Sequence, residues 1–240
     1  MTLAIHLYRR VMRRGRLIGL IALSSVPALA FWLSAYDSGP DEAAVLYSDI
    51  VARLGFSYAI AVLILTVAIL REERDAGTLP YIYMRPIGRE AMAASSIAAG
   101  IAAALTLALA GWLVSLLAVL ALASPASTSL AGLAQYTAAG VGYAAVFVPL
   151  GYLVPRSILV GLGYIIVVES ILAEVVTGLA QVSIWRIALS ISADIGANDD
   201  PGEMLDAIAP GVGGGIAKMG VVLVLGFGVL VWALRRRDAL

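Results

Sequence analysis

The sequence predicts an all-α integral membrane protein with six transmembrane helices, an amphipathic N-terminal elbow helix and both termini in the cytoplasm. Three observations support this fold class. Hydrophobic residues make up 61% and charged residues 13% of the chain, against about 45–50% and about 25% in soluble domains. The mean hydropathy is +0.96. The apolar residues form long runs, and the basic residues gather between alternate runs.

Residues 1–16 are predicted to form the elbow helix. Leu3, Leu7 and Val11 recur every four residues and therefore share one helical face. The arginines fall largely on other faces: Arg9, Arg10, Arg13 and Arg14. A helix of this kind lies at a membrane surface, where its arginines meet anionic lipid, so membrane lipid is an expected partner. Two interpretations stay open, a simple positive-inside anchor or an elbow that leads into the first span. The one histidine, His6, is taken as an interfacial residue.

The remaining chain, 17–240, is predicted to be one membrane domain. A span needs about 20 mostly apolar residues. Six segments qualify: 17–36, 51–70, 91–122, 131–154, 157–180 and 212–234. The third is long enough that it must tilt or project into water. Pro27 and Pro149 are expected to kink or break their helices. The alternative count is five spans and one re-entrant segment.

The basic residues set the predicted orientation. With the N-terminus in the cytoplasm, thirteen of the sixteen Lys and Arg residues lie inside, and only Arg53, Arg186 and Lys218 lie outside. Nine acidic residues fall in the outer segments, which are a polar loop over 37–50 and an extracellular loop over 181–211. Apolar residues such as Ile187 and Ile191 suggest short external or re-entrant helices within the second loop.

The cytoplasmic loop 71–90 carries eight of the chain's 32 formal charges between two apolar runs. Gly77 can end the helix that arrives from the second span, and Thr78 can cap a new one. Arg85, Pro86 and Arg89 then lead into the third span. The predicted order is helix, break, short amphipathic helix, break, helix. A short helix that projects into the cytoplasm from two membrane helices is suited to receiving force from a soluble partner.

This loop resembles the one found in permease subunits of type-2 ATP-binding-cassette (ABC) exporters. That family carries an acidic–basic cluster, a Gly-Thr pair, a short apolar stretch and a closing Pro with a nearby Arg. The matching residues are Glu73, Arg74, Asp75, Gly77, Thr78, Leu79, Arg85, Pro86 and Arg89. Ala76 stands where the family often has a charged residue, and Pro80 comes early in the predicted short helix. The elbow, six spans and inside termini match the family over nearly the whole chain.

The resemblance implies a function for the loop. It would act as a coupling helix seated on separate cytoplasmic ABC ATPase subunits, which bind and hydrolyse ATP with Mg. This chain would then be a non-catalytic transport subunit without a cofactor, metal site or nucleic-acid partner of its own. The sequence contains no Gly-x-x-x-x-Gly-Lys-[Ser/Thr] phosphate loop, and the absence of cysteine excludes disulfides and thiolate metal sites.

The expected assembly is two permeases, either two copies of this chain or one copy with a related permease, in a bacterial or archaeal plasma (inner) membrane. The expected cargo is amphipathic: a drug, peptide or lipid. Two other classes stay open. A secondary transporter or channel would need no ATPase, but it would usually show broken repeats, and the sequence has no clear inverted repeat. A membrane scaffold or maturation factor would bind a partner without moving cargo.

Two carboxylates, Glu169 and Glu174, fall within the predicted fifth span, where charge is costly and often functional. Glu169 is expected in the outer half of the membrane, as a gating or pathway group or as a structural hydrogen-bond acceptor. Glu174 is expected near the outer surface, where it can pair with Lys218 unless Lys218 snorkels to the interface. Because the two carboxylates lie five positions apart along a helix, they point about 140° apart and do not form one site. Related permeases often carry a Glu here, before an outer re-entrant turn.

Overall fold

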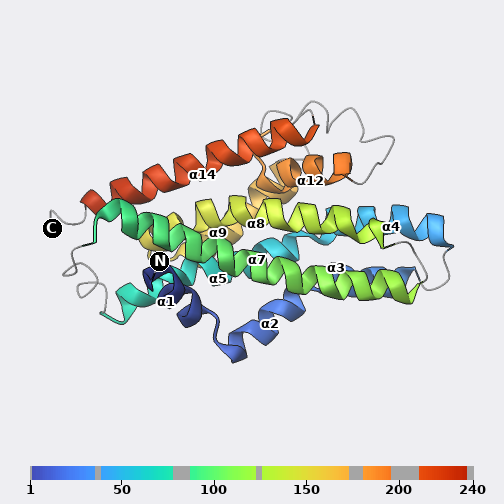
Figure 1. Cartoon of the computed structure of the whole chain (residues 1–240), viewed down its shortest axis with the longest axis horizontal. Coiled ribbons are helices and arrows are strands. Elements are labelled where there is room, and N and C mark those ends of the chain that lie inside the picture. Colours follow the sequence, from blue (N-terminus) through green and yellow to red (C-terminus); the bar gives the residue numbers. More distant parts are fainter. Residues whose placement is uncertain are drawn as a thin grey trace.

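The computed structural model describes residues 2–35, 39–77, 87–122, 126–172, 181–195 and 211–236. Every regular element in these ranges is a helix. The longer helices run roughly along the long axis of the molecule (Figure 1). The predicted all-helical fold is therefore confirmed over the described part of the chain.

The N-terminal segment forms three short helices, α1 (Thr2–Val11), α2 (Arg14–Ser24) and α3 (Val26–Ser34). The predicted first span is broken, because the axes of α2 and α3 differ by 43°. Pro27 lies in the first turn of α3, and the hydroxyls of Ser24 and Ser25 donate to the carbonyl of Ile21 at 2.9 and 2.8 Å. Such bonds back to the preceding turn bend helices, and Pro is favoured at a helix start. The expected break near Pro27 is confirmed.

The next segment, 40–54, is a helix and not the polar loop that the sequence predicted. α4 (Pro40–Leu54) precedes α5 (Phe56–Asp75), and the two meet at a 42° bend. Pro40 starts α4, where its lack of an N–H costs nothing. Ala43, Tyr47 and Val51 recur every four residues and are buried. The acidic residues on the other faces concealed this apolar stripe in the sequence.

Gly55 marks the bend between α4 and α5. A Cβ atom at this position would lie 1.6 Å from Cζ2 of Trp185. The indole N–H of Trp185 also donates to the carbonyl of Ala52 at 2.9 Å. Only a residue without a side chain leaves room for the indole ring at this point, so a distant tryptophan holds the α4–α5 junction in place.

The next two helices form the centre of the bundle. α7 (Arg89–Ala121) has 33 residues, and α8 (Ser127–Leu153) continues through Pro149 to its end. At about 1.5 Å per residue, α7 is about 50 Å long and exceeds the hydrocarbon core of about 30 Å. The prediction of an unusually long third helix is confirmed, whereas Pro149 does not end α8. α8 packs against both α5 and α7.

The C-terminal third contains three shorter elements and one long helix: α9 (Ser157–Gly163), the π-helix η1 (Tyr164–Leu172), α12 (Ile184–Ile195) and α14 (Gly211–Arg236). The predicted fifth span over 157–180 appears as a short apolar helix, Ser157–Glu169, within the described residues. In the predicted extracellular loop, α12 buries Ile184, Ile187 and Ile191 against the bundle. The expectation of a short helix in this loop is confirmed.

Three described helices are long and apolar enough to cross a membrane, and the number rises to five if each bent pair is one span. The described residues therefore do not reach the predicted six spans. The second half of the predicted fifth span, 173–180, lies outside the described residues, so six spans and the alternative of five with one re-entrant segment both stay predictions.

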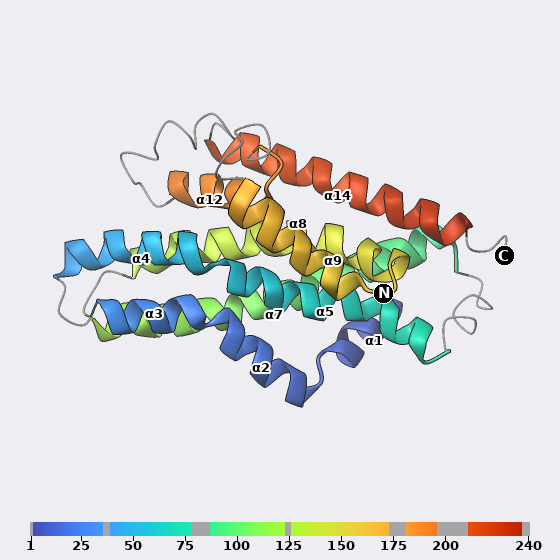
Figure 2. The same ribbon diagram turned by 180° about the vertical axis from the view of Figure 1, so that it is seen from behind.

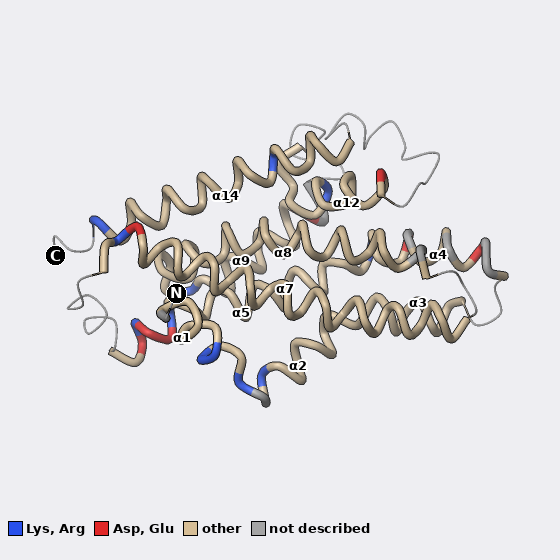
Figure 3. The backbone as a smooth tube through the Cα atoms, viewed as in Figure 1, with Lys and Arg blue, Asp and Glu red and all other residues tan. Residues whose placement is uncertain are grey.

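The start of α1, the end of α5, the start of α7 and the end of α14 lie toward one end of the bundle, as the two opposite views show (Figures 1 and 2). Most of the described Lys and Arg residues lie toward this end as well (Figure 3). An ion pair joins Arg235 on α14 to Glu90 on α7 at 2.5 Å. Both ends of the described chain thus lie toward the same end of the bundle (Figures 1 and 2), and the side of the membrane that this end faces stays a prediction.

The contact at Gly55 gives a first test of the fold. Gly55→Ala forces the Trp185 ring to move, and we expect this overpacking to cost about 1–3 kcal/mol and to lower the Tm of the detergent-solubilised protein. Gly19→Ala is the matched control, because a Cβ there meets nothing within 4 Å. Combining Gly55→Ala with Trp185→Leu should recover part of the loss. A Tm for Gly55→Ala equal to that of Gly19→Ala would contradict the packing described here.

Candidate functional site

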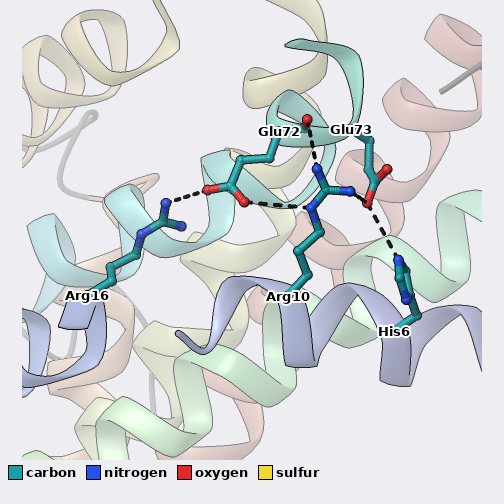
Figure 4. Close-up of polar contacts among 5 residues, drawn as sticks. All are labelled: His6, Arg10, Arg16, Glu72 and Glu73. Carbon is teal, nitrogen blue, oxygen red and sulfur yellow. Dashed lines mark hydrogen bonds and ion pairs between the residues drawn. The ribbon is translucent and has the colours of Figure 1, made fainter. Parts of the chain in front are cut away.

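A cluster of charged side chains joins α1 and the start of α2 to the end of α5. We call it the elbow cluster, and its members are His6, Arg10, Arg16, Glu72 and Glu73 (Figure 4). The Arg10 guanidinium donates to the Glu73 carboxylate and to the Glu72 carbonyl, the latter at 3.3 Å. Arg16 donates to the Glu72 carboxylate, and Nε2 of His6 lies 3.8 Å from Oε1 of Glu73. Two arginines thus hold two consecutive carboxylates.

The Glu73–Arg10 ion pair is more buried than the Glu72–Arg16 pair, so it matters more for stability. The Glu73 side chain is 2% exposed and that of Arg10 is 22% exposed, whereas Glu72 and Arg16 are 25% and 32% exposed. A buried carboxylate is costly unless a cation and hydrogen bonds compensate it. Arg10 supplies both to Glu73. The Glu72–Arg16 pair is more accessible to water and contributes less.

Apolar contacts bring Arg10 to this position. Leu7 and Val11 of α1 are buried, and the helix packs against α5 and α7. The Tyr8 hydroxyl also lies 3.0 Å from Oγ1 of Thr106 on α7. The predicted stripe of Leu3, Leu7 and Val11 is confirmed as the buried side of an amphipathic helix. It faces two other helices of the chain, and this contact brings Arg10 to the end of α5.

The residues after Glu73 attach α5 to a third helix. Arg74 donates to the carbonyl of Tyr152, near the end of α8, at 3.1 Å. Asp75 is 57% exposed and pairs with Arg71 at 3.3 Å and with Arg74 at 3.6 Å. α5 ends at Asp75, and Gly77 has φ +66°, the left-handed conformation that glycine adopts after helices. The helix break expected at Gly77 is therefore present.

The C-terminal end of the loop 71–90 is also attached to another helix. Arg89 is the first residue of α7, and its neighbour Glu90 pairs with Arg235 of α14. Four predicted coupling residues lie outside the described residues: Thr78, Leu79, Arg85 and Pro86. The structure thus shows how both flanks of the loop are held. The short helix expected between them stays a prediction.

Glu169 lies at the other predicted site and is 8% exposed. Its carboxylate accepts hydrogen bonds from the hydroxyls of Tyr164 and Ser183, the first at 2.7 Å. The backbone N–H groups of Ile184 and Trp185 donate to it at 3.0 and 3.2 Å. These two N–H groups belong to the first turn of α12, where a helix favours negative charge. Glu169 therefore joins η1 to the N-terminus of α12.

The sequence carries one signal for this network. Ser183 precedes the apolar run that forms α12, the pattern of a helix N-cap. In the structure its hydroxyl accepts the Arg186 N–H at 3.2 Å while it donates to Glu169. Four donors to one carboxylate favour the structural interpretation of Glu169, and the gating role stays a prediction. Glu174, with its proposed pairing to Lys218, lies outside the described residues.

Within the described ranges, no group of three or more His, Cys, Asp or Glu side chains is placed to hold a metal ion. The charged groups of the elbow cluster are instead engaged with one another. The arrangement is suited to holding helices together and transmitting displacement between them.

The pairing of Arg10 with Glu73 can be measured by a double-mutant cycle. We expect Arg10→Gln to destabilise the protein by about 2–3 kcal/mol, because Glu73 stays buried without its main cation. Glu73→Gln in the same background should cost much less than it does alone, which gives a coupling of about 1–3 kcal/mol in thermal or denaturant unfolding. Asp49→Asn breaks an exposed pair with Arg53 and should change stability by about 0.5 kcal/mol or less. Additive effects of the two cluster substitutions would exclude the pairing.

Glu169 gives a second measurement. Glu169→Ala leaves the two N–H donors and two hydroxyls without their acceptor, and each buried unsatisfied group costs about 1–3 kcal/mol. We expect a large fall in Tm, a smaller one for Glu169→Gln, and about 1 kcal/mol for loss of the cap in Ser183→Ala. Ser192→Ala, a buried serine near the other end of α12, is the control. If Glu169→Ala is no less stable than the control, the carboxylate does not hold α12.

Comparison with known proteins places this arrangement in a family. A family model described as "ABC-2 family transporter protein" matches residues 12–168, which are 157 of the 240 residues. The matched segment includes Arg16, both carboxylates at the end of α5 and the whole loop 71–90. A comparison with curated proteins finds no match. Members of this family are membrane permease components of ABC transporters and are generally non-catalytic. This chain belongs to the ABC-2 transporter family.

Proposed function

We propose that this chain is the permease subunit of an ABC exporter, and that its loop 71–90 couples ATP hydrolysis on a separate cytoplasmic ATPase subunit to export of an amphipathic substrate. Membership of the ABC-2 family supports a permease with an ATPase partner. In this proposal ATP and Mg bind the partner, two permeases pair in a bacterial or archaeal plasma membrane, and the cargo is a drug, peptide or lipid.

The observation that carries the proposal is the attachment of both flanks of the loop to other helices. On one side, Glu73 holds α1 through Arg10, Glu72 holds the start of α2 through Arg16, and Arg74 holds the end of α8. On the other side, Glu90 pairs with Arg235 of α14. A force on residues between these flanks would therefore reach α1, α5, α7, α8 and α14 together. Charge-assisted hydrogen bonds are shorter and stronger than neutral ones, so they suit this transmission.

We use the burial of each loop residue to assign it either to holding the flank of the loop in position or to contacting the ATPase. Glu73 is buried and Arg74 is 25% exposed and bound to α8, so we assign both to holding the flank in position. Asp75 is 57% exposed, and it can reach a partner. Thr78, Leu79, Arg85 and Pro86 would contact the ATPase, with Gly77 and Arg89 at the two ends of the contact. Interfacial charges of this kind set register more than affinity.

For the export cycle, closure of the ATPase subunits would push the loop and shift the attached helices as one unit. Glu169 would hold α12 against η1 during this shift, because its four hydrogen bonds tie the two elements together. In the gating alternative, one of these bonds would open during transport. Glu169→Gln and Glu169→Ala variants that both transport at the normal rate once folded would exclude the gating role.

The coupling proposal predicts an uncoupled phenotype for Gly77→Pro. Proline requires φ near −65°, whereas Gly77 has φ +66°, so the end of α5 must rearrange. In a complex purified with its ATPase subunit and reconstituted in vesicles, we expect ATP hydrolysis to continue while transport and substrate stimulation fall at least ten-fold. Charge reversal at Glu73 and Arg74 should do the same, with an added loss of stability.

Gly39→Pro is the matched control for this experiment, because Gly39 has φ −69°, which suits proline. It should leave transport unchanged. Unchanged transport in Gly77→Pro, with a monodisperse complex, would reject the coupling role. Transport by the chain without any ATPase would instead indicate a secondary transporter or channel.

A further inference from the structure

A surface groove follows the end of α14, with Glu90 at the start of α7 on its edge, and none of its lining residues belongs to the elbow cluster. Its volume is about 480 Å³, within the range of about 300–1,000 Å³ for ligand sites. Phe227, Val231 and Trp232 provide apolar lining, and Glu90, Arg235 and Arg236 provide the charged part. An apolar trough that ends in cations has the chemistry of an anionic amphiphile's binding site.

The two arginines of the groove are held differently. Arg235 pairs with Glu90 at 2.5 Å, so its charge is partly compensated. The Arg236 guanidinium lies 4.5 Å from the centroid of the Trp232 ring. A cation–π contact orients a guanidinium without neutralising it. Arg236 therefore presents a positive charge directly beside the apolar trough.

The position of the groove on α14 indicates what surrounds it. α14 is one of the candidate spans, and only 17% of its most apolar window is buried in the chain. Its outward residues include the exposed Val224, Leu225 and Val229. The side chains of this face are as apolar as lipid tails and suit contact with them. At the end of the helix, Trp232 and the arginines are the residue types that meet lipid headgroups.

We propose that this groove binds one anionic phospholipid. The phosphate would lie against Arg236, with Arg235 as its second cation, and one acyl chain would follow Phe227, Val231 and Trp232. The positive charge of Arg236 complements the phosphate, and a zwitterionic headgroup would bind less well because its own cation is repelled. This proposal needs only a membrane-embedded chain, so it stands independently of ATPase coupling and transport.

Native mass spectrometry of the full-length chain in detergent tests the proposal, with phosphatidylglycerol and phosphatidylcholine of the same acyl chains as probes. We expect one phosphatidylglycerol to bind more tightly than phosphatidylcholine. One cation near a lipid surface contributes about 1 kcal/mol, so Arg236→Gln should weaken phosphatidylglycerol binding about five-fold. Glu90→Gln should strengthen it, because Arg235 loses its competing carboxylate. Lys218→Gln, on the same helix but outside the groove, should have no effect.

Several outcomes would overturn the proposal. Equal binding of the two lipids would exclude recognition of the anionic headgroup, and equal binding of glycerol phosphate alone would exclude a lipid site. Weaker binding in Glu90→Gln would show that Arg235 is not a second cation for the phosphate, because freeing it from its carboxylate should strengthen binding. Because tighter binding cannot arise from misfolding, that variant separates the proposal from a general loss of structure. If Trp232→Ala changes the oligomeric state but not lipid binding, the groove holds a second copy of the chain.

Discussion

The carboxylate of Glu73 is buried at the end of α5, and its burial depends on Arg10 of the N-terminal helix. Neither residue could occupy its position alone, because an uncompensated charge in this environment costs several kcal/mol. The pair therefore makes the docking of α1 and the position of the end of α5 mutually dependent. Since the loop 71–90 begins at this point, the elbow helix determines from where the loop departs.

The same physical solution recurs at a second site in the fold. Glu169 is also a buried carboxylate, but four hydrogen bonds compensate it, two of them from the first turn of α12. Trp185 of that helix in turn fills the space beside Gly55 and fixes the bend between α4 and α5. One acidic side chain thus positions a helix whose tryptophan shapes another pair of helices. In both places a charge that is unfavourable in the interior specifies a single arrangement of helices.

These attachments also bear on the proposed mechanism. Where a loop joins two helices that are free to move, a push at the loop is dissipated in local bending. Here the two flanks hold α1, α8 and α14 through charged hydrogen bonds, and α8 packs in turn against α5, α7, α12 and α14. A displacement of the loop would therefore involve most of the bundle. The cost is that the charged residues nearest to the loop serve the interior of the chain as well as any partner.

The sequence by itself determined the features that depend on local composition and period: the apolar helices, the amphipathic face of Leu3, Leu7 and Val11, the break near Pro27 and the end of α5 before Gly77. It identified Glu73, Arg74 and Glu169 as unusual because charge between apolar runs is visible without coordinates. Only the tertiary structure decided their partners. Arg10 and Glu73 are 63 residues apart, and Glu169 meets Ser183 across 14 residues. It also decided that 40–54 is helical. The physical reason is that helical periodicity is local, whereas the compensation of a buried charge comes from whichever distant element packs against it.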